Sequence, residues 1–514
     1  MGGWTILLAA PGCTPAPGPT DPGEKAPVQP PVTSETAPLR PPGTPAPEQD
    51  PVPAPVEVVT LVTAAGDPDT MVEIAVTLTG LASVAVACIS DTERDQIFFA
   101  ESAVPADAHT LRLSGLLPAD TYTCTAAPTG PPPVGPAAST IWITSPPPED
   151  VHPFTVLINP LLGMTGAWTL APHALGLFTD PDYLVIWGPD GRPRWWTRLP
   201  DGIRMSIEAL YHTEDDVIVW GGGASPDGRI RMHDLWEGEL YAWAPDGWEE
   251  TTFHHDAKRI ADGRLLTLED QQNTADGDTW EGFRIRAHDP TTGIVDFDFG
   301  SQTLVEQGIL PPPDSTTDND PYHANWMDWH ETADGPRVYV SLCYAEQIMA
   351  LDPDTGDVVW LLGAGLGWTV LGEMGGDIGE GALPDCTHGL EVLGDDHLLV
   401  YDNGLNETSS NAQEWLVDPD ARTAQRMWTW TEPDWSQWYL GDIDDLGNGR
   451  VLITKAPGPL VEVEKATGVV ASRMELPIGD TYRAERYAGC DFFTAVKDCP
   501  ELAERYEEVR AFLE

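Results

Sequence analysis

Short apolar runs recur from about residue 155 to the end of the chain, and each is followed by a polar turn that starts a new run. The turns carry a Pro-Asp-Gly or Pro-x-Thr-Gly core, or a close variant of it. Six copies start at Gly188, Ala244, Asp289, Asp352, Asp418 and Glu464. Short strands repeated at roughly even spacing are typical of β-propeller blades. The pattern therefore predicts an all-β region of about six blades.

A second type of turn precedes most of these copies. It joins two apolar runs through an Asp/Asn-Gly type of hairpin around Gly263, Asp396 and Gly449, and such sequences favour tight hairpins. We expect the two turn types together to form the outer hairpins of four-stranded blades, in a propeller over residues 155–490. Residues 491–514 have apolar positions at helical spacing and predict a helical cap.

Residues 56–147 contain β-rich runs separated by Gly, Pro and Asp, which predicts a small β-sandwich in front of the propeller. Within it, residues 113–122 resemble the turn of fibronectin type III domains in which a tyrosine, here Tyr122, closes the corner before a strand. That resemblance implies a spacer or adhesion module. The predicted fold is therefore all-β, a six-bladed propeller preceded by a sandwich.

The N-terminal segment carries signals of export rather than of folded structure. Residues 1–13 are a short apolar run that ends in small residues before Cys13, which has the form of a lipoprotein signal without its usual basic leader. Residues 14–55 are rich in proline and predict an extended, disordered linker. We expect an exported protein, periplasmic or at the cell surface, that meets a membrane only through a lipid on Cys13.

Charge excludes two classes of partner. The chain has 82 acidic and 27 basic residues, a net charge of −55. Such a chain repels phosphate backbones and anionic lipid head groups. Nucleic acids and anionic membrane surfaces are therefore not expected partners, and the acidic surface suits a salty or extracellular medium.

Apart from Cys13, the chain has an even number of cysteines, which fits three disulfides in an oxidising compartment. Six cysteines allow 15 pairings. The most economical set joins cysteines that are neighbours along the chain: Cys88 to Cys124, Cys343 to Cys386, and Cys490 to Cys499. We interpret Cys343 as half of a disulfide across the propeller mouth rather than as a second nucleophile.

Three histidines, His255, His323 and His388, precede blade hairpins. The inner strand of each blade faces the central channel, so residues at its start converge on the channel mouth. Imidazole suits nucleophilic or acid-base chemistry near neutral pH. Three histidines from separate strands also fit a zinc site with an open position. We rank that alternative lower, since no spacing typical of metal sites accompanies them, and we expect no metal.

The His-His-Asp motif at 254–256, the Asp-x-x-His-x-Asn motif at 320–325 and the His388 segment that ends in Asp-Asn-Gly are similar to those of the bacterial arylsulfate sulfotransferases. This resemblance implies transfer of a sulfuryl group from a small aromatic sulfate ester to a phenol through a sulfated histidine, without a cofactor. By motif, His388 is the nucleophile, and His255 and His323 stabilise the sulfuryl oxygens and assist proton transfer. The residues expected to orient them are Asn325, Asp402 and Asn403.

One position departs from the family pattern. Where the family has an Arg in a Ser-x-Arg motif, this chain has Cys343 after Ser341 and Leu342. Loss of one such donor typically costs on the order of 10²- to 10³-fold in rate. The cations considered as substitutes are Lys258, Arg259 and Lys455. The departure also leaves open a non-catalytic surface propeller that binds a protein or carbohydrate.

Overall fold

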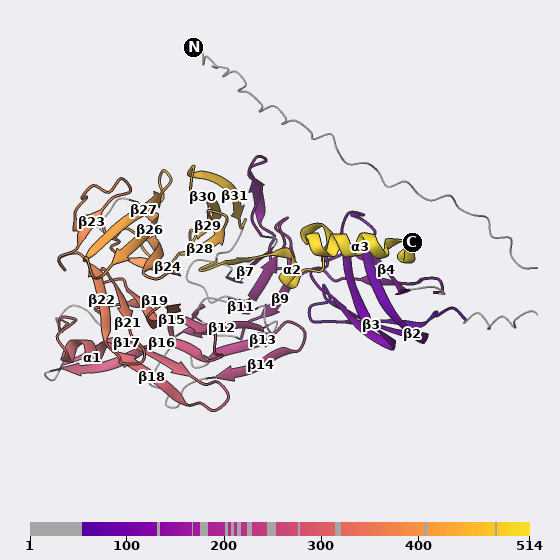
Figure 1. Ribbon diagram of the computed structural model, residues 1–514, viewed down its shortest axis with the longest axis horizontal. Coiled ribbons are helices and arrows are strands. Elements are labelled where there is room, and N and C mark those ends of the chain that lie inside the picture. The colour runs from indigo at the N-terminus through magenta and orange to yellow at the C-terminus, as the bar shows by residue number, and fades with distance from the viewer. Residues whose placement is uncertain are drawn as a thin grey trace, which may run out of the picture. The chain divides into compact units, whose positions relative to one another are not determined.

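The computed structural model describes residues 54–130, 134–166, 168–174, 183–200, 204–206, 210–212, 217–223, 229–243, 253–275, 278–313, 320–405, 409–477 and 481–514. Cys13, the segment 1–13 and nearly all of the linker 14–55 lie outside these residues. Strands dominate the described chain (Figure 1), so the all-β prediction is confirmed.

The first sheet contains β1 (Val58–Ala65), β2 (Val72–Ser90), β3 (Ile97–Leu113), β4 (Thr121–Thr129) and β5 (Ala138–Ile143). The long strand β2 pairs with β1, β3 and β4, and β5 extends the sheet from β4. Alternate positions of β2 are buried, as expected for a strand with one face in a core. The buried Tyr122 hydroxyl accepts a hydrogen bond of 2.6 Å from the Leu117 amide, so this tyrosine ties the preceding turn to β4.

Six further sheets follow in the described residues. Their strands, in the order in which they pair, are β32 (Glu485–Tyr487), β7 (Trp168–His173), β8 (Tyr183–Trp187) and β9 (Pro193–Arg198); β10 (Arg204–Ser206), β12 (Val217–Gly223), β13 (Ile230–Asp234) and β14 (Gly238–Trp243), with β11 (Leu210–His212) on β12; β15 (Phe253–Arg259), β16 (Leu265–Ala275), β17 (Asp278–His288) and β18 (Val295–Gly300); β19 (Ala324–Thr332), β20 (Gly335–Leu342), β21 (Gln347–Leu351) and β22 (Val358–Gly363); β24 (Thr387–Gly394), β25 (His397–Asp402), β26 (Asn411–Asp418), β27 (Thr423–Trp430) and β23 (Thr369–Leu371); β28 (Asp442–Gly447), β29 (Arg450–Thr454), β30 (Leu460–Glu464), β31 (Val469–Glu475) and β6 (Thr155–Ile158).

The two ends of this region close onto each other. The late strand β32 pairs with β7 in the first of the six sheets, and the early strand β6 pairs with β31 in the last. First strands of successive sheets lie side by side, β15 against β19, β19 against β24 and β24 against β28 (Figure 1). Residues at the start of these strands are therefore brought together.

The middle strands read as unbroken apolar runs because both of their faces are buried. Strands β8, β25 and β29 are buried at nearly every position. The cores lie between neighbouring sheets; one of them, for example, joins Leu399 of β25 to Ile453 of β29. A strand packed on both sides needs apolar residues at all positions, which explains why alternation is weak here.

The repeated turns place the outer strands. In two copies, the Asp289 and Asp352 carboxylates each accept hydrogen bonds from two backbone amides of their own turn, and Gly293 and Gly356 have φ of 71° and 73°. These turns join the third and fourth strands. The hairpins at Gly263, Asp396 and Gly449 instead join the first and second strands. Our expectation that both types form outer hairpins was wrong, because the second type lies next to the inner strand.

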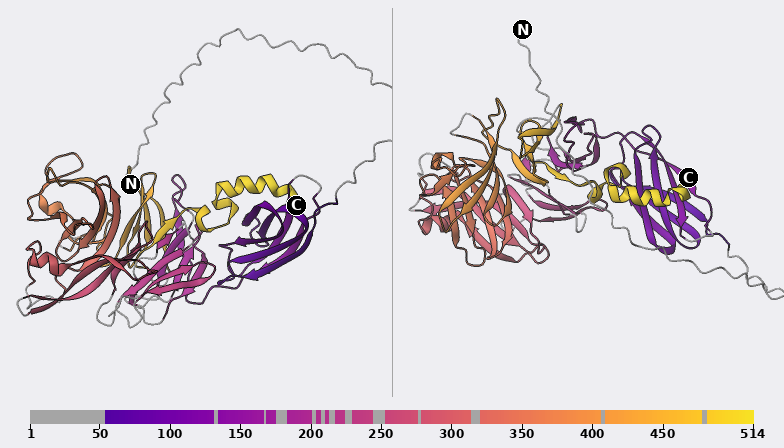
Figure 2. Two further views of the ribbon diagram at one scale, coloured as in Figure 1. Left: turned by 60° about the horizontal axis from the view of Figure 1, so that its bottom comes forward. Right: turned by 45° about the horizontal axis from the view of Figure 1, so that its top comes forward.

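The helices are α1 (Ser301–Glu306), α2 (Gly489–Phe492) and α3 (Pro500–Leu513). Helix α3 lies along β2 and β4 of the first sheet, and the Tyr506 ring meets Phe99 at 5.7 Å (Figure 2). Among the described residues, no helix has the length and apolar character needed to cross a membrane.

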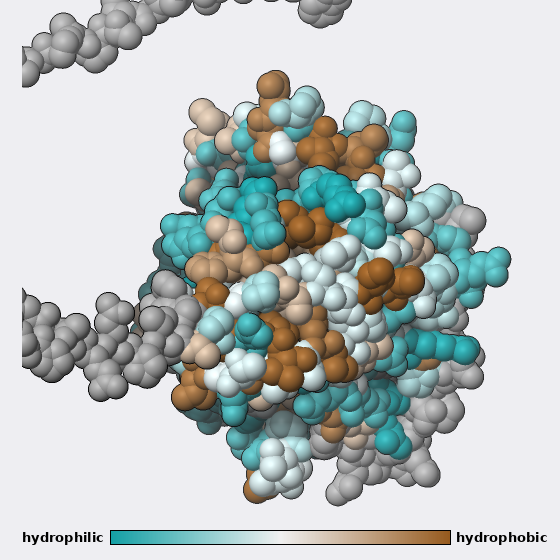
Figure 3. Space-filling view, turned by 90° about the vertical axis from the view of Figure 1, so that its right-hand side faces the viewer, coloured by the Kyte–Doolittle hydropathy of each residue, from teal (hydrophilic) through white to brown (hydrophobic). Residues whose placement is uncertain are grey.

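The surface seen in Figure 3 mixes hydrophilic residues with several hydrophobic patches. Large apolar side chains are exposed on β1 and β5, including Val59, Val62, Ile141 and Ile143. These positions belong to the outward face of the first sheet, and no titratable residue named in the sequence analysis lies on these strands.

Candidate active site

Three histidines from three neighbouring sheets lie together at the starts of inner strands. His255 lies in β15, His323 directly precedes β19, and His388 lies in β24. The ring centroids are 5.1 Å apart for His255 and His323, 6.0 Å for His255 and His388, and 6.4 Å for His323 and His388. His255 and His388 are buried, at 6% and 4% exposure. The arrangement leaves room for one small group to contact all three rings.

The backbone departs from regular strand geometry at each histidine. His255 and His323 have φ of 63° and 46°, in the left-handed region that residues other than glycine seldom occupy. Strand pairing shifts register around all three positions, between Phe253 and Ala257, between Ala324 and Trp326, and between Thr387 and Gly389. Each left-handed residue costs on the order of 1 kcal/mol or more, and such strain is concentrated at functional sites.

Hydrogen bonds to Asn403 set the tautomer of His388. The Asn403 amide nitrogen donates to the carbonyls of Gln437 and Leu440 at 2.9 and 3.0 Å. Its oxygen must therefore be the atom that faces His388 Nδ1, at 2.6 Å. A carbonyl oxygen only accepts, so Nδ1 carries the proton and Nε2 keeps its lone pair. His388 is thus held in the form that a nucleophilic imidazole requires.

His323 is oriented by a carboxylate. Asp320 accepts a hydrogen bond from His323 Nδ1 at 2.6 Å and another from its backbone amide at 3.0 Å. The opposite ring nitrogen, Nε2, is thereby left to exchange protons. The Tyr344 ring stacks on the imidazole at 4.5 Å with an interplanar angle of 18°. Tyr344 is 53% exposed, so an aromatic surface borders this histidine on the solvent side.

His255 has the complementary hydrogen-bonding role. Its Nδ1 lies 3.1 Å from the hydroxyl of Tyr482. Burial raises the pKa of Tyr482 to about 12, so the hydroxyl keeps its proton. Arg483 Nη2 donates to the same hydroxyl oxygen at 3.4 Å, which directs the hydroxyl proton to His255. Nδ1 therefore accepts, and Nε2 of His255 carries an N–H.

A buried guanidinium lies beneath the histidines. Arg483, just before β32, is 1% exposed. Its Nη2 donates to the carbonyls of Asn325 and His388 at 2.8 and 3.2 Å, and Nη1 lies 3.4 Å from Asp256 Oδ1. This one side chain thus connects the three sheets that carry the histidines. The sequence analysis missed it, although Arg483 occupies the same place before an inner strand as the histidines do.

The predicted orienting residues have different surroundings. Asn325 is fully buried, and no other described residue forms a hydrogen bond with either atom of its amide. Asp402 accepts from the Gly404 amide at 3.1 Å and from the Gln413 side chain at 3.0 Å. Burial, with the charge of Asp385, raises the pKa of Asp402. Asp402 therefore shapes the turn that holds Asn403 rather than contacting His388.

The three cations considered as substitutes for the family arginine have partners elsewhere. Lys258 Nζ lies 4.1 Å from the Trp326 ring centroid and 4.0 Å from Asp328. Lys455 is paired with Glu432, and burial lowers the pKa of its ammonium group. Lys258 and Arg259 line a separate pocket of about 290 Å³ that contains none of the three histidines. Arg483, not these residues, places positive charge at the imidazoles.

This second pocket is acidic, and Asp442, Asp444 and Glu485 hold carboxylate oxygens within 4.8 Å of one another there. Burial raises the pKa of Glu391 in the same pocket to about 7, and the charges of Asp445 and Asp328 add to the effect. A raised carboxyl pKa means that the protonated form favours the folded state. Its contribution to stability is complete below the unfolded pKa, near 4.5, and is lost as the pH rises through about 7.

We therefore predict that Glu391→Gln makes the protein more stable at pH 8 than the parent, by up to about 3 kcal/mol, with little difference at pH 4.5. The amide retains an oxygen that can accept from the Asp445 backbone, as Glu391 does. Urea unfolding at both pH values measures the change. An equal gain or loss at the two pH values would show that Glu391 does not titrate on unfolding.

All three predicted disulfides are present: Cys88–Cys124, Cys343–Cys386 and Cys490–Cys499. They are consistent with an oxidising compartment. The second joins neighbouring sheets beside His388, whose Nδ1 lies 3.8 Å from Cys386 Sγ. Cys343 is thus not a free thiol nucleophile.

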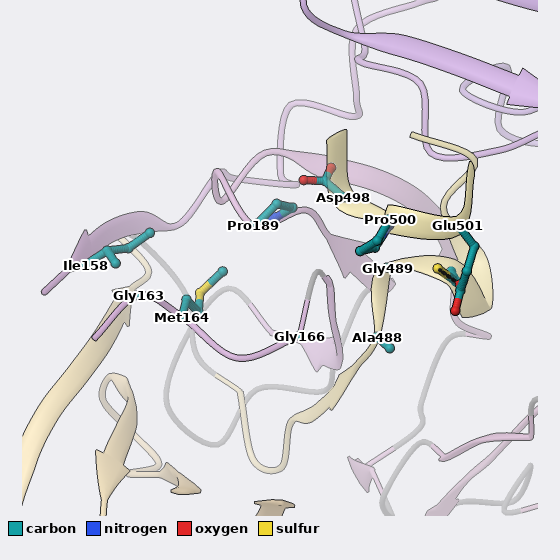
Figure 4. Close-up of a pocket in the computed structure, with 11 residues that line it drawn as sticks. Ile158, Gly163, Met164, Gly166, Pro189, Ala488, Gly489, Asp498, Pro500 and Glu501 are labelled. Carbon is teal, nitrogen blue, oxygen red and sulfur yellow. Dashed lines mark hydrogen bonds between the residues drawn. The ribbon is translucent and has the colours of Figure 1, made fainter. Parts of the chain in front are cut away.

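A larger pocket, of about 690 Å³, lies away from the histidines (Figure 4). Its lining includes Ile158, Met164, Pro189 and Asp498, and the Cys490 end of the third disulfide. Apolar and backbone groups dominate, and no histidine contributes. Its composition does not match the chemistry that the imidazole cluster offers.

One family profile, described as arylsulfotransferase (ASST), matches residues 177–475, more than half of the chain. No curated protein matches the chain. Among solved structures, the chain is similar to the Cps50 (Swd1) β-propeller domain of Myceliophteria thermophila (12% identity, 63% of this chain, 87% of that chain, TM-score 0.36), a functionally unknown protein of Desulfotomaculum acetoxidans (12%, 71%, 95%, 0.36) and Sqt1 of Saccharomyces cerevisiae (12%, 62%, 87%, 0.32). None of these structural likenesses bears on function.

Proposed function

The chain belongs to the arylsulfotransferase family, and we propose that it transfers a sulfuryl group from an aryl sulfate ester to a phenol through a sulfated His388. The observation that carries the proposal is the set of complementary tautomers in the histidine cluster. His388 offers a lone pair at Nε2, because Asn403 holds the Nδ1 proton. His255 offers an N–H, because Tyr482 donates to its other nitrogen.

In the first step, Nε2 of His388 attacks sulfur. An N–S bond forms as the ester S–O bond breaks, and the electron pair of that bond leaves on the aryl oxygen. His323, when protonated and paired with Asp320, gives that oxygen its proton from Nε2 and becomes neutral. The Nε2–H of His255 and the buried Asn325 amide are placed to donate to the sulfuryl oxygens, which a site for charge transfer requires.

The second step reverses the first with a new phenol. Neutral His323 takes the phenol proton, the phenolate oxygen attacks sulfur, and the N–S bond breaks with its electrons returning to His388 Nε2. The protonated His323 that results is ready for the next donor. The cycle requires no nucleotide or metal, since donor and acceptor differ only in the aryl group attached to oxygen.

Arg483 replaces the family guanidinium in this proposal. It lies within hydrogen-bonding distance of the His388 carbonyl and forms an ion pair with Asp256. It therefore acts by holding the backbone of the nucleophile and by supplying positive potential below a trianionic transition state. We classify it as a positioning residue, because its guanidinium bonds to protein groups.

We also propose the setting of the enzyme. Three disulfides favour an exported protein, and Cys13 would carry a lipid that tethers the folded part through the proline-rich linker. The first sheet would serve as a fibronectin type III-like spacer. The hydrogen bond between the Tyr122 hydroxyl and the Leu117 amide supports that assignment, since it closes the turn before β4.

The test is incubation of the oxidised full chain with para-nitrophenyl sulfate, with and without phenol. We expect nitrophenol release that depends on phenol, with ping-pong kinetics, and a mass increase of one SO₃ group on the peptide that contains His388 after an alkaline quench without acceptor. A folded protein that releases no phenol from a panel of aryl sulfates would refute the transferase and favour a propeller that binds a surface partner.

A further inference from the structure

The Cys343–Cys386 disulfide is built into the backbone of the histidine cluster. Cys343 follows β20 and Cys386 precedes β24, and each is 1% exposed. The Cys343 amide donates to the His323 carbonyl at 3.1 Å, and the Asn403 amide donates to the Cys386 carbonyl at 2.8 Å. The bond thus couples the sheet of His323 to the sheet of His388.

The two sulfur atoms and His388 also have the spacing of a metal ligand set. The ligand atoms of Cys343, Cys386 and His388 all lie within 4.8 Å of one another, and all three residues are buried. Cys386 Sγ is 3.8 Å from His388 Nδ1. In a tetrahedral zinc site with Zn–S of about 2.3 Å and Zn–N of about 2.0 to 2.1 Å, sulfur and nitrogen ligands are about 3.6 Å apart. The observed separation is close to that value.

We propose that reduction of this disulfide turns the cluster into a zinc site formed by the two cysteine thiolates and His388. A sulfur in a disulfide is not a thiolate and does not hold zinc. A dithiol reductant supplies two electrons and two protons, so it becomes a disulfide while the Cys343–Cys386 bond becomes two thiols. Zinc then displaces the two thiol protons, forms two Zn–S bonds and one Zn–N bond, and takes water as its fourth ligand.

The consequence is a chain with two alternative states. In the oxidised state, Asn403 holds His388 Nδ1 and leaves Nε2 reactive. In the reduced state, zinc occupies the imidazole and withdraws the same residue from chemistry. The protein is then silent in a reducing compartment and active in an oxidising one. This consequence rests on the proposed function, whereas the zinc site itself does not.

The test uses the full chain carrying Cys490→Ser and Cys499→Ser, because that pair and Glu501 form another group of candidate ligands. The protein is made in a reducing cytosol with zinc sulfate and purified under a reductant. We expect about one more zinc per chain, by elemental analysis, than in the variant that also carries Cys343→Ser and Cys386→Ser. Adding His388→Ala to the parent should weaken zinc binding tenfold or more in a chelator competition.

Equal zinc content in the parent and the Cys343→Ser, Cys386→Ser variant, with matching near-UV circular dichroism, would overturn the proposal. So would retention of the same zinc after oxidation. Activity is a separate arm: removal of zinc with a chelator followed by reoxidation should raise turnover by at least tenfold. Zinc binding without this rise overturns the switch, and zinc binding in a protein inactive in every state refutes the proposed function alone.

Discussion

His388→Ala is expected to lower kcat/KM for aryl sulfate turnover by about 10⁴-fold or more, because the variant has no atom to receive the sulfuryl group. Loss of a nucleophile removes both steps of the reaction, so the sulfated peptide should vanish together with turnover. The measurement is steady-state release of nitrophenol combined with mass spectrometry of the quenched protein. Folding of the variant is checked by urea unfolding.

The matched control is His397→Ala. His397 lies in β25 of the same sheet and pairs with Glu414 at 2.7 Å, and its side chain is 32% exposed. Removal of this surface histidine should leave kcat/KM within about twofold of the parent, since an exposed pair contributes at most about 1 kcal/mol to stability and touches no substrate. Sulfation of His388→Ala at another residue would instead show that the nucleophile has been assigned to the wrong histidine.

The sequence was a good guide to the fold because the repeated turns have local causes. An Asp that accepts bonds from amides of its own turn and a glycine at positive φ need no distant partner, as at Asp352 and Gly356. The role of the second hairpin type was misjudged because position within a blade depends on which strands of neighbouring sheets touch. That information is in the tertiary structure and not in the hairpin itself.

The candidate site was predicted in part for a similar reason. The three histidines fall at equivalent places in a repeat, so the strand order brings them together. Their tautomers could not be predicted, because Tyr482 reaches His255 from a strand far along the chain. Arg483 was overlooked because its short strand β32 lacks the hairpin that marks the other blades. A search for polar residues before every inner strand would have found it.

Replacement of Arg483 has the second largest expected effect. In Arg483→Met, the carbonyls of Asn325 and His388 lose a donor and the buried Asp256 loses its ion pair. Removing one partner of a buried pair typically costs about 3 to 5 kcal/mol of stability. We also expect kcat to fall by about 10²- to 10³-fold, the usual cost of losing a charged donor where negative charge develops.

The stability loss and the catalytic loss can be separated with further variants. Arg483→Met combined with Asp256→Asn removes both charges and should recover much of the stability while kcat stays low. Arg483→Lys keeps the charge but not the paired donors, so it should restore part of kcat with little change in KM. Urea unfolding gives the stability, and turnover per folded protein gives kcat.

A buried arginine remote from the histidines provides the control for general destabilisation. Arg450 pairs with the fully buried Glu462 at 2.9 Å, and the pair lies between β29 and β30. Arg450→Met should lower the free energy of unfolding and leave kcat per folded molecule unchanged. If the Arg483→Met, Asp256→Asn protein folds and turns over at the parental rate, Arg483 only holds the sheets together. Wild-type chemistry would then proceed without a guanidinium at the site, and the histidines with Asn325 would supply all of the stabilisation.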